Sequence, residues 1–227
     1  MQQSIHIVFA LFPRLTQLDF TGPLEVLWRV PGARLTLASA QGGTLSADSG
    51  LSLAELARLG DVAGADVLCV PGGSGVTEAL RDAEYMQHVR RLGASARYLT
   101  SVCSGSLILA GAGLLEGKRA ACHWAWRPLL AEQGVLVDEG RIARDGHVIT
   151  GGGVTAGIDF GLALAAELAG EEVACAIQLA IEYAPAPPFS SGRPELASPG
   201  VVAAARERVA LSYPERRAAL REARQRR

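Results

Sequence analysis

The strongest constraint on this chain is an alternation between short apolar runs and longer stretches with helical periodicity. Apolar runs of strand length lie at Ile5–Phe12, Arg34–Ser39, Ala65–Val70 and Arg97–Val102. Strands that alternate with helices form βα units, which pair into a parallel sheet with helices packed on its faces. The sequence therefore predicts an α/β fold, with a doubly wound, mostly parallel sheet sandwiched by helices.

The same pattern gives approximate bounds for the helices and the minor strands. Helical periodicity runs through Leu15–Trp28, 75–92, Leu107–Leu115, Thr155–Leu168 and Glu171–Tyr183. Short strands are expected within Val135–Thr150 and, as a small antiparallel excursion, within Leu45–Leu53. Because proline lacks the amide that a helix interior needs, Gly22-Pro23 predicts a kink or a split in the first helix.

Charge is distributed unevenly along the 227 residues, although the formal net charge is only −1. Residues 184–227 hold nine arginines and four acidic side chains, whereas residues 1–183 hold 13 basic and 19 acidic ones. A near-neutral total argues against a dedicated nucleic-acid binder, which carries a basic domain to neutralise phosphates.

We therefore divide the chain into a domain over 1–188 and an Arg-rich C-terminal extension over 189–227. The prolines of the extension leave room for a helix over Val201–Leu211 and a second one after Pro214, so the extension is expected to be partly helical or disordered. Its expected use is packing against the acidic body or against a partner subunit.

The four cysteines lack the paired spacing of a metal or redox motif: Cys69, Cys103, Cys122 and Cys175. The N-terminus runs into an apolar strand without a basic leader region, and no apolar run approaches ~18 residues. These features predict a cytoplasmic protein with reduced, mostly buried thiols and no membrane span.

Cys103 is the strongest candidate for a reactive group, because it stands between a predicted strand and a predicted helix. Its neighbours Ser101, Ser104, Gly105 and Ser106 are small, which is the sequence form of a nucleophile elbow. Reactive groups of an open α/β sheet gather at the carboxyl ends of its strands. The amides that begin the following helix should lower the pKa of the thiol. An inert buried thiol is the alternative.

Gly72 and Gly73 end the preceding strand, in the segment Val70-Pro71-Gly72-Gly73. Because glycine lets a chain turn with its amides facing inward, these two amides and that of Ser104 are candidates to stabilise an oxyanion or to bind substrate. A plain turn is the alternative for this segment.

Two further side chains are candidates for the site. Asp19 lies in the apolar context Leu18-Asp19-Phe20, where burial raises a carboxyl pKa and suits the group to proton donation. A helix N-cap is its alternative role. His123 is the one histidine expected near the site, with capping or packing of a strand end as its alternative.

Five segments together resemble the class I glutamine amidotransferase-like superfamily of PfpI type: 18–23, 70–73, 101–106, 122–124 and 149–159. The resemblance runs from about Ile5 to Pro188. Within the superfamily the chain is most similar to the isocyanide (isonitrile) hydratases, which convert an isocyanide and water to an N-substituted formamide. The resemblance implies a flavodoxin-like fold, a cytoplasmic homodimer, a small-molecule isocyanide substrate, no metal and no organic cofactor.

Departures from other members favour this activity. Peptidase-like members carry His directly after the nucleophile, where this chain has Ser104. Glyoxalase- and deglycase-like members place Glu where this chain has Asp19, and glutaminase domains need a downstream His-x-Glu pair, which it lacks. The hydratases have Asp at that acid position and Thr after the cysteine, so Ser104 keeps the hydroxyl. The resemblance thus implies catalysis by Cys103, through a covalent thioimidate, with Asp19 and Ser104.

Two other functions remain open from the sequence. AraC-type regulators carry a similar ligand-sensing domain, but they continue into helix-turn-helix units of on the order of 100 residues. Only 44 residues follow Tyr183, which disfavours that reading. An aldehyde-handling enzyme of the glyoxalase or deglycase type is the second alternative. For an isocyanide, which is small and uncharged, we expect an apolar pocket.

Overall fold

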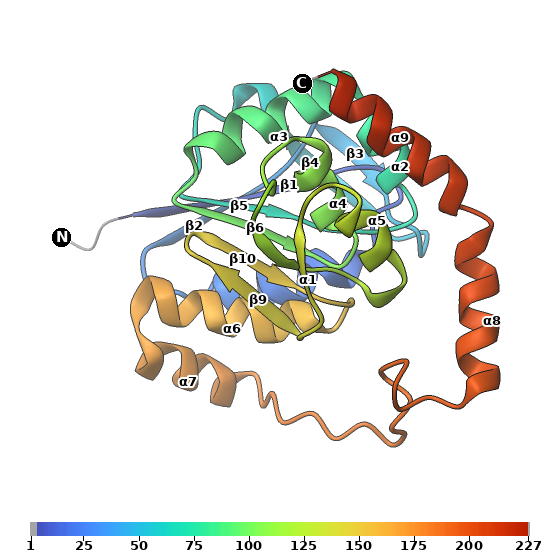
Figure 1. Ribbon diagram of the computed structural model, residues 1–227. Coiled ribbons are helices and arrows are strands. Elements are labelled where there is room, and N and C mark those ends of the chain that lie inside the picture. The colour runs from blue at the N-terminus through green and yellow to red at the C-terminus, as the bar shows by residue number, and fades with distance from the viewer. Residues whose placement is uncertain (1–3, 227) are drawn as a thin grey trace.

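The computed structural model describes residues 4–226 and centres on an eight-stranded sheet in the order β3-β4-β2-β1-β5-β6-β10-β9 (Figure 1). The strands from β4 to β10 pair in parallel, and β3 and β9 run antiparallel at the two edges. Their bounds are β1 Ile5–Leu11, β2 Ala33–Ser39, β3 Gly43–Ser46, β4 Ser52–Arg58, β5 Val67–Val70, β6 Tyr98–Val102, β9 Ile142–Asp145 and β10 Val148–Gly151. A second sheet pairs β7 Arg119–Ala121 with β8 Leu136–Asp138.

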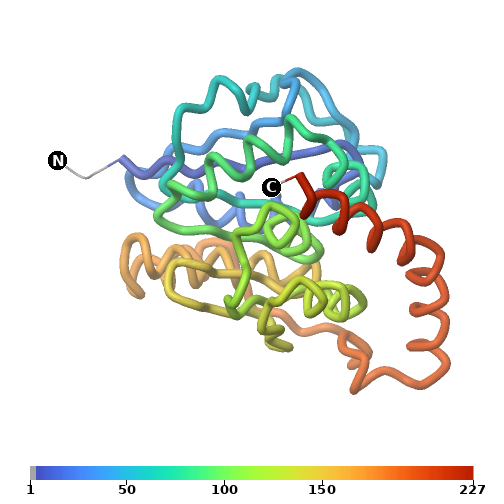
Figure 2. The backbone as a smooth tube through the Cα atoms, turned by 45° about the horizontal axis from the view of Figure 1, so that its top comes forward, coloured from blue at the N-terminus to red at the C-terminus, as the bar shows by residue number. Residues whose placement is uncertain are grey.

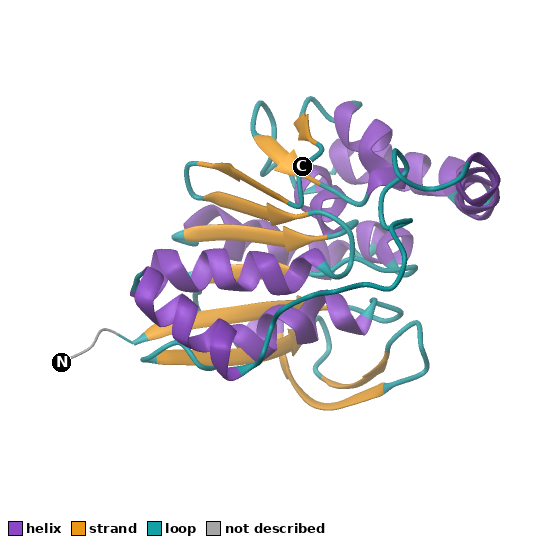
Figure 3. Ribbon diagram, turned by 90° about the horizontal axis from the view of Figure 1, so that it is seen from below, coloured by secondary structure: helices purple, strands orange, loops and turns teal. Residues whose placement is uncertain are grey.

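Helices cover both faces of the main sheet, as expected for a doubly wound fold. One layer consists of α1 Gln17–Leu27, α6 Ala156–Ala169 and α7 Glu171–Ala180, which lie across the strands in the view from below (Figure 3). The other layer contains α2 Val76–Arg81, α3 Ala83–Ser95 and α4 Gly105–Gly111. The short helices η1 Leu59–Asp61, η2 Trp124–Trp126 and α5 Arg127–Ala131 complete the body. The predicted fold class is confirmed.

The helix bounds differ from expectation at two places, each for a local reason. The single helix expected over 75–92 is divided into α2 and α3, because the Asp82 carboxylate accepts a hydrogen bond of 3.0 Å from the Tyr85 amide and caps α3. Helix α1 is not split at Gly22-Pro23. A Cβ on Gly157 of α6 would lie 3.0 Å from Pro23 Cδ, so the proline is held within a close contact between the two helices.

The C-terminal extension forms two helices, α8 Pro199–Ala210 and α9 Tyr213–Gln225. Helix α9 returns to the body and lies beside α2 and α4 (Figure 2). It buries Ala219, Leu220 and Ala223 in the same core as the central strands. Ion pairs of 2.8 Å from Arg81 to Glu215 and 2.7 Å from Arg217 to Glu132 flank that contact. In this structure the extension packs against the body through α9, and both of its segments are helical.

Candidate active site

Cys103 occupies a strained turn between β6 and α4. Its φ is +59°, in the left-handed region that non-glycine residues rarely adopt. Its amide donates hydrogen bonds to the carbonyl oxygens of Gly152 at 2.7 Å and Gly151 at 3.1 Å, at the end of β10. Gly105 has no room for a side chain, since a Cβ there would lie 2.2 Å from the oxygen of Val70. The structure thus has the nucleophile-elbow geometry that the sequence predicts.

Asp19 lies beside this turn, in the first turn of α1, and is 1% exposed. Its Oδ2 accepts a hydrogen bond of 2.8 Å from the Gly72 amide, and the carboxyl interacts with the Cys103 thiol. Oδ1 is buried without a hydrogen-bond partner among the described residues. Burial raises the pKa of Asp19 to about 7, although the Gly72 amide and the thiol oppose it. The N-cap of α1 is Thr16, so the alternative role of Asp19 is wrong.

The Cys103 thiol is less acidic than the sequence suggested. Burial raises its pKa well above the usual value, and the negative charge of the nearby Asp19 carboxylate adds to the effect. The Ser104 amide lowers the pKa, but burial outweighs it. The expectation of a thiolate in the resting site is therefore wrong. The thiol holds its proton next to a carboxyl that can accept it.

Gly72, Gly73 and Ser104 surround Asp19 and Cys103 as expected, but their amides already have acceptors. The Gly72 amide donates to Asp19, and the Gly73 amide donates to Ser104 Oγ at 3.2 Å. The Ser104 amide interacts with the Cys103 sulfur. Their role in binding an oxyanion or substrate stays a prediction. It requires that the substrate accept the hydrogen bond that the Gly73 amide now donates to the Ser104 hydroxyl.

Gly72→Ala is expected to lower the free energy of unfolding by about 1–3 kcal/mol through overpacking. The added Cβ would lie 2.6 Å from Ser104 N and 2.9 Å from Asp19 Oδ2. At this chain length the change lowers Tm by ~2–4 °C per kcal/mol, measurable by differential scanning calorimetry. Gly64→Ala is the matched control, because a Cβ there meets nothing within 4 Å. Equal Tm values for the two variants would contradict the close approach at Gly72.

His123 lines the site without contacting the thiol through its ring. Its Nδ1 accepts a hydrogen bond of 3.3 Å from the Ala125 amide, so it caps the short helix η2 rather than a strand end. Burial and the charges of Arg127 and Arg216 lower the pKa of His123, so the ring is neutral at neutral pH. Only its backbone joins the elbow, by a hydrogen bond of 3.3 Å from its amide to the Cys103 carbonyl.

Arg216 is the side chain at this site that the sequence analysis missed. It belongs to α9, is 3% exposed, and lies with its guanidinium carbon 4.0 Å from the centroid of the Trp126 ring. The arginine shares one helix face with the buried residues Ala219, Leu220 and Ala223, at positions i, i+3, i+4 and i+7. That spacing was the available signal, because it places Arg216 on the apolar face of the extension.

The cavity at Cys103 has a volume of about 330 Å³. Its surface is more apolar than polar, although many of the lining side chains carry a polar group: Arg14, Thr16, Gly73, Ser74, Cys103, Ser104, His123, Trp126, Val154, Arg208, Val209, Ser212 and Arg216. The expected apolar pocket is therefore matched in part, because the extension adds arginines from α8 and α9 to a site built on the parallel sheet.

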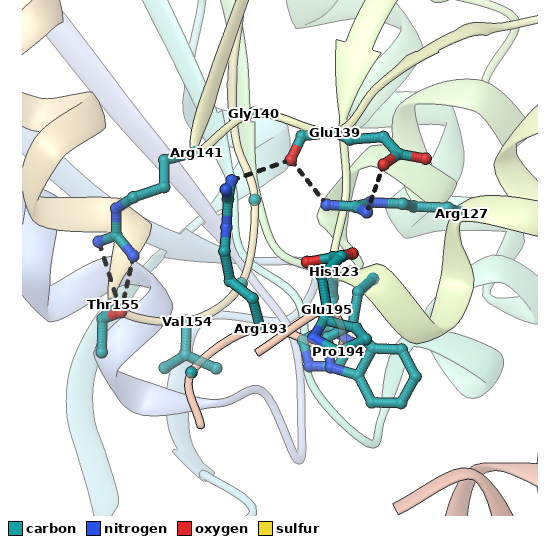
Figure 4. Close-up of a pocket in the computed structure, with 14 residues that line it drawn as sticks. His123, Arg127, Glu139, Gly140, Arg141, Val154, Thr155, Arg193, Pro194 and Glu195 are labelled. Atoms are coloured by element: carbon teal, nitrogen blue, oxygen red, sulfur yellow. Dashed lines mark hydrogen bonds and ion pairs between the residues drawn. The ribbon is translucent and has the colours of Figure 1, made fainter. Parts of the chain in front are cut away.

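A second cavity, of about 210 Å³, adjoins the first at His123 (Figure 4). Two of its three arginines face carboxylates: Arg127 lies 3.6 Å from the Glu139 carboxylate, and Arg141 forms an ion pair with Asp159. The third, Arg193, donates a hydrogen bond of 3.3 Å to the backbone oxygen of Glu139. Among the described residues, no cluster of three or more His, Cys, Asp or Glu side chains could hold a metal ion. No helix in that part of the chain is long and apolar enough to cross a membrane.

Comparison with known proteins identifies relatives in sequence and in fold. The sequence is 47% identical to isonitrile hydratase from Pseudomonas putida over 92% of each chain. It is 32% identical to the transcriptional regulator CdhR from Pseudomonas aeruginosa, over 73% of this chain and 51% of the regulator. The crystal structure of a ThiJ/PfpI family protein from Pseudomonas syringae superposes with a TM-score of 0.93 at 38% identity, covering 96% of this chain and 91% of that one.

Residues 5–167 match the DJ-1/PfpI family, and this range covers most of the α/β body described above. The nucleophile elbow at Cys103 and the buried Asp19 both fall within the matched range. This chain belongs to the DJ-1/PfpI family.

Proposed function

We propose that this protein is a cysteine-dependent isonitrile hydratase, a lyase that converts an isocyanide and water to an N-substituted formamide. The observation that carries the proposal is the buried Cys103 thiol beside an Asp19 carboxyl whose pKa is about 7. An isocyanide carbon must gain both a nucleophile and a proton, and this pair holds one of each. The near full-length similarity to the Pseudomonas putida hydratase supports the substrate class.

The first step forms the covalent intermediate. The Cys103 sulfur attacks the terminal isocyanide carbon as the thiol proton passes to the Asp19 carboxylate. Asp19 then delivers that proton to the same carbon, which gives a thioimidate, R–N=CH–S–Cys103. Oδ1 of Asp19 is the oxygen available for this transfer, because the Gly72 amide occupies Oδ2. One proton moves and none is lost to solvent.

The second step returns the enzyme to its starting state. Water adds to the thioimidate carbon, its hydroxyl staying on carbon and a proton passing to nitrogen with Asp19 as the relay. The resulting tetrahedral species collapses, the C–S bond breaks, and the sulfur regains a proton as the formamide leaves. In this proposal the attacking water takes the place of the Ser104 hydroxyl on the Gly73 amide, and the Ser104 hydroxyl helps to orient it.

The direct test is to incubate the protein with cyclohexyl isocyanide and to follow the formation of N-cyclohexylformamide by chromatography. A parallel incubation with methylglyoxal addresses the aldehyde-handling alternative on the same scaffold. Turnover of the isocyanide alone supports the hydratase. Turnover of methylglyoxal alone would overturn it in favour of the second function.

We also propose a cytoplasmic homodimer, as the family resemblance implies. Large apolar side chains outside the core support a partner surface: Leu179 is 82% exposed and Phe189 80% exposed. Sedimentation equilibrium should give about twice the chain mass of 23.7 kDa. A single species at the monomer mass across micromolar concentrations would contradict the dimer.

A further inference from the structure

The cavity at Cys103 is positively charged, and the described residues compensate that charge only in part. Three arginines line it, Arg14, Arg208 and Arg216, and no Asp or Glu does. Arg14 forms an ion pair of 3.0 Å with Glu78, outside the cavity lining. Arg208 and Arg216 form no ion pair with any described carboxylate. In the adjoining cavity two of the three arginines, Arg127 and Arg141, face the carboxylates of Glu139 and Asp159.

The positive charge of Arg216 is energetically unfavourable at this place, because its guanidinium is buried. Nε donates to Thr77 Oγ1 at 3.3 Å, and Nη2 donates to the carbonyl oxygens of Gly73 at 3.2 Å and Ser74 at 3.1 Å. All of these acceptors are neutral, and the guanidinium carbon lies 4.0 Å from the centroid of the Trp126 ring. Burial lowers the pKa of Arg216 to about 10, so it remains a cation at neutral pH, and the Glu78 charge acts on it without forming an ion pair. A buried cation that has no paired carboxylate favours the binding of an anion beside it.

We propose that the cavity binds isocyanides that carry a carboxylate, with Arg216 as the residue that recognises the anionic group and Arg208 assisting at the exposed side. The inference rests on the hydratase function and specifies its substrate class. A guanidinium offers a planar set of donors that matches a carboxylate. Cys103 and Arg216 line the same cavity of about 330 Å³, so one small molecule can place its isocyanide carbon at the sulfur and its carboxylate at Arg216.

A purely structural role for Arg216 makes a different prediction. Its hydrogen bonds to Thr77 and to the Gly73–Ser74 backbone tie α9 to the start of α2. If docking of α9 were its whole purpose, substitution would change turnover of charged and neutral substrates by the same factor. Recognition of an anion requires that the ratio between the two substrates change.

The test compares kcat/KM for isocyanoacetate with kcat/KM for its neutral methyl ester, which has the same isocyanide group. The unmodified protein is expected to prefer the anion about tenfold, the scale of one hydrogen bond to a charged group. Arg216→Gln should lower that ratio about tenfold. Arg208→Gln should lower it about twofold to threefold, because an exposed charge is screened by solvent. Arg221→Gln removes the same charge from an exposed site on α9 outside this cavity and should leave the ratio unchanged.

The outcomes separate the inference from the function on which it rests. If both probes are hydrated and the ratio is the same in the unmodified, Arg216→Gln and Arg208→Gln proteins, the carboxylate preference is wrong and the hydratase stands. If neither these probes nor cyclohexyl isocyanide is hydrated, both fail. If circular dichroism shows that Arg216→Gln is unfolded, Arg208→Gln decides, since its side chain is exposed. An unchanged ratio in that variant overturns the proposal.

Discussion

Cys103→Ala is expected to lower kcat for isocyanide hydration by at least about 10³-fold, because removal of a covalent nucleophile leaves no group to form the thioimidate. The substitution removes one sulfur from a buried turn, and it keeps the amide that donates to Gly151 and Gly152. The fold should therefore persist, which far-ultraviolet circular dichroism would verify. Formamide release measured by chromatography gives the rate.

Two other cysteines provide matched controls for that substitution. Cys175 is exposed on α7, and Cys175→Ala should retain full turnover. Cys122 is buried beside the site, where burial raises the pKa of its thiol to about 12, and unlike Cys103 it has no hydrogen bond to a described carboxyl that could accept its proton. Cys122→Ala should keep activity, with a modest loss of stability. Turnover above a tenth of the unmodified rate in Cys103→Ala, or its loss in Cys122→Ala alone, would reassign the nucleophile.

Asp19→Asn is the second large change, and it should lower kcat by about 10²–10⁴-fold, the usual contribution of a positioned acid–base group. The amide cannot accept the thiol proton or pass it to the isocyanide carbon. Its similar size keeps contact with Gly72 and isolates the proton transfer from packing. Asp19→Glu is the companion variant, because it retains a carboxyl and should recover part of the rate if titration is what matters.

The direction in which kcat/KM changes with pH tests which protonation state of Asp19 is reactive. The thiol stays protonated until well above neutrality, so the reactive form is the one in which Asp19 is ionised and can accept the thiol proton. The value of kcat/KM should therefore rise with pH through about 7 and then level. The ascending limb should be absent from the residual activity of Asp19→Asn. An activity that falls through pH 7 would show that Asp19 must instead start protonated.

Whereas kcat/KM should rise with pH, the contribution of Asp19 to the free energy of unfolding should fall as pH rises. Asp19 holds its proton to about pH 7 in the folded protein but has an ordinary pKa of 3.8 when unfolded. Between those values the folded state binds more protons, so the free energy of unfolding contributed by Asp19 falls as pH rises and stays low above pH 7. Asp19→Asn should remove this fall and be the more stable protein at pH 8, which urea unfolding would measure.

The meeting of Cys103 with Asp19 and Gly72 could be predicted from sequence because of the topology. All three positions follow or lie near the carboxyl ends of neighbouring parallel strands, which must end at one edge of the sheet. The apolar neighbours of Asp19 also gave the direction of its pKa shift. The sign of the Cys103 shift was missed, because it depends on how deeply the thiol is buried, and a helix start alone does not reveal that.

Arg216 could not be placed in the same way. It is far from Cys103 along the chain, and the two meet only because α9 folds back onto α2 and α4. The net charge of the extension does not indicate where any one of its arginines lies in the folded protein. The arginines of the pocket were missed for the same reason, since an isocyanide site built on residues 1–188 alone would lack Arg208 and Arg216.

The central claim is a covalent thioimidate on Cys103, and rapid acid quenching followed by intact-protein mass spectrometry tests it most directly. Mixed with cyclohexyl isocyanide during turnover, the protein should gain the mass of one isocyanide, and peptide mapping should place that mass on Cys103. The adduct should disappear once substrate is exhausted and should be absent from Cys103→Ala. Steady formamide production with the adduct on another residue would contradict the account.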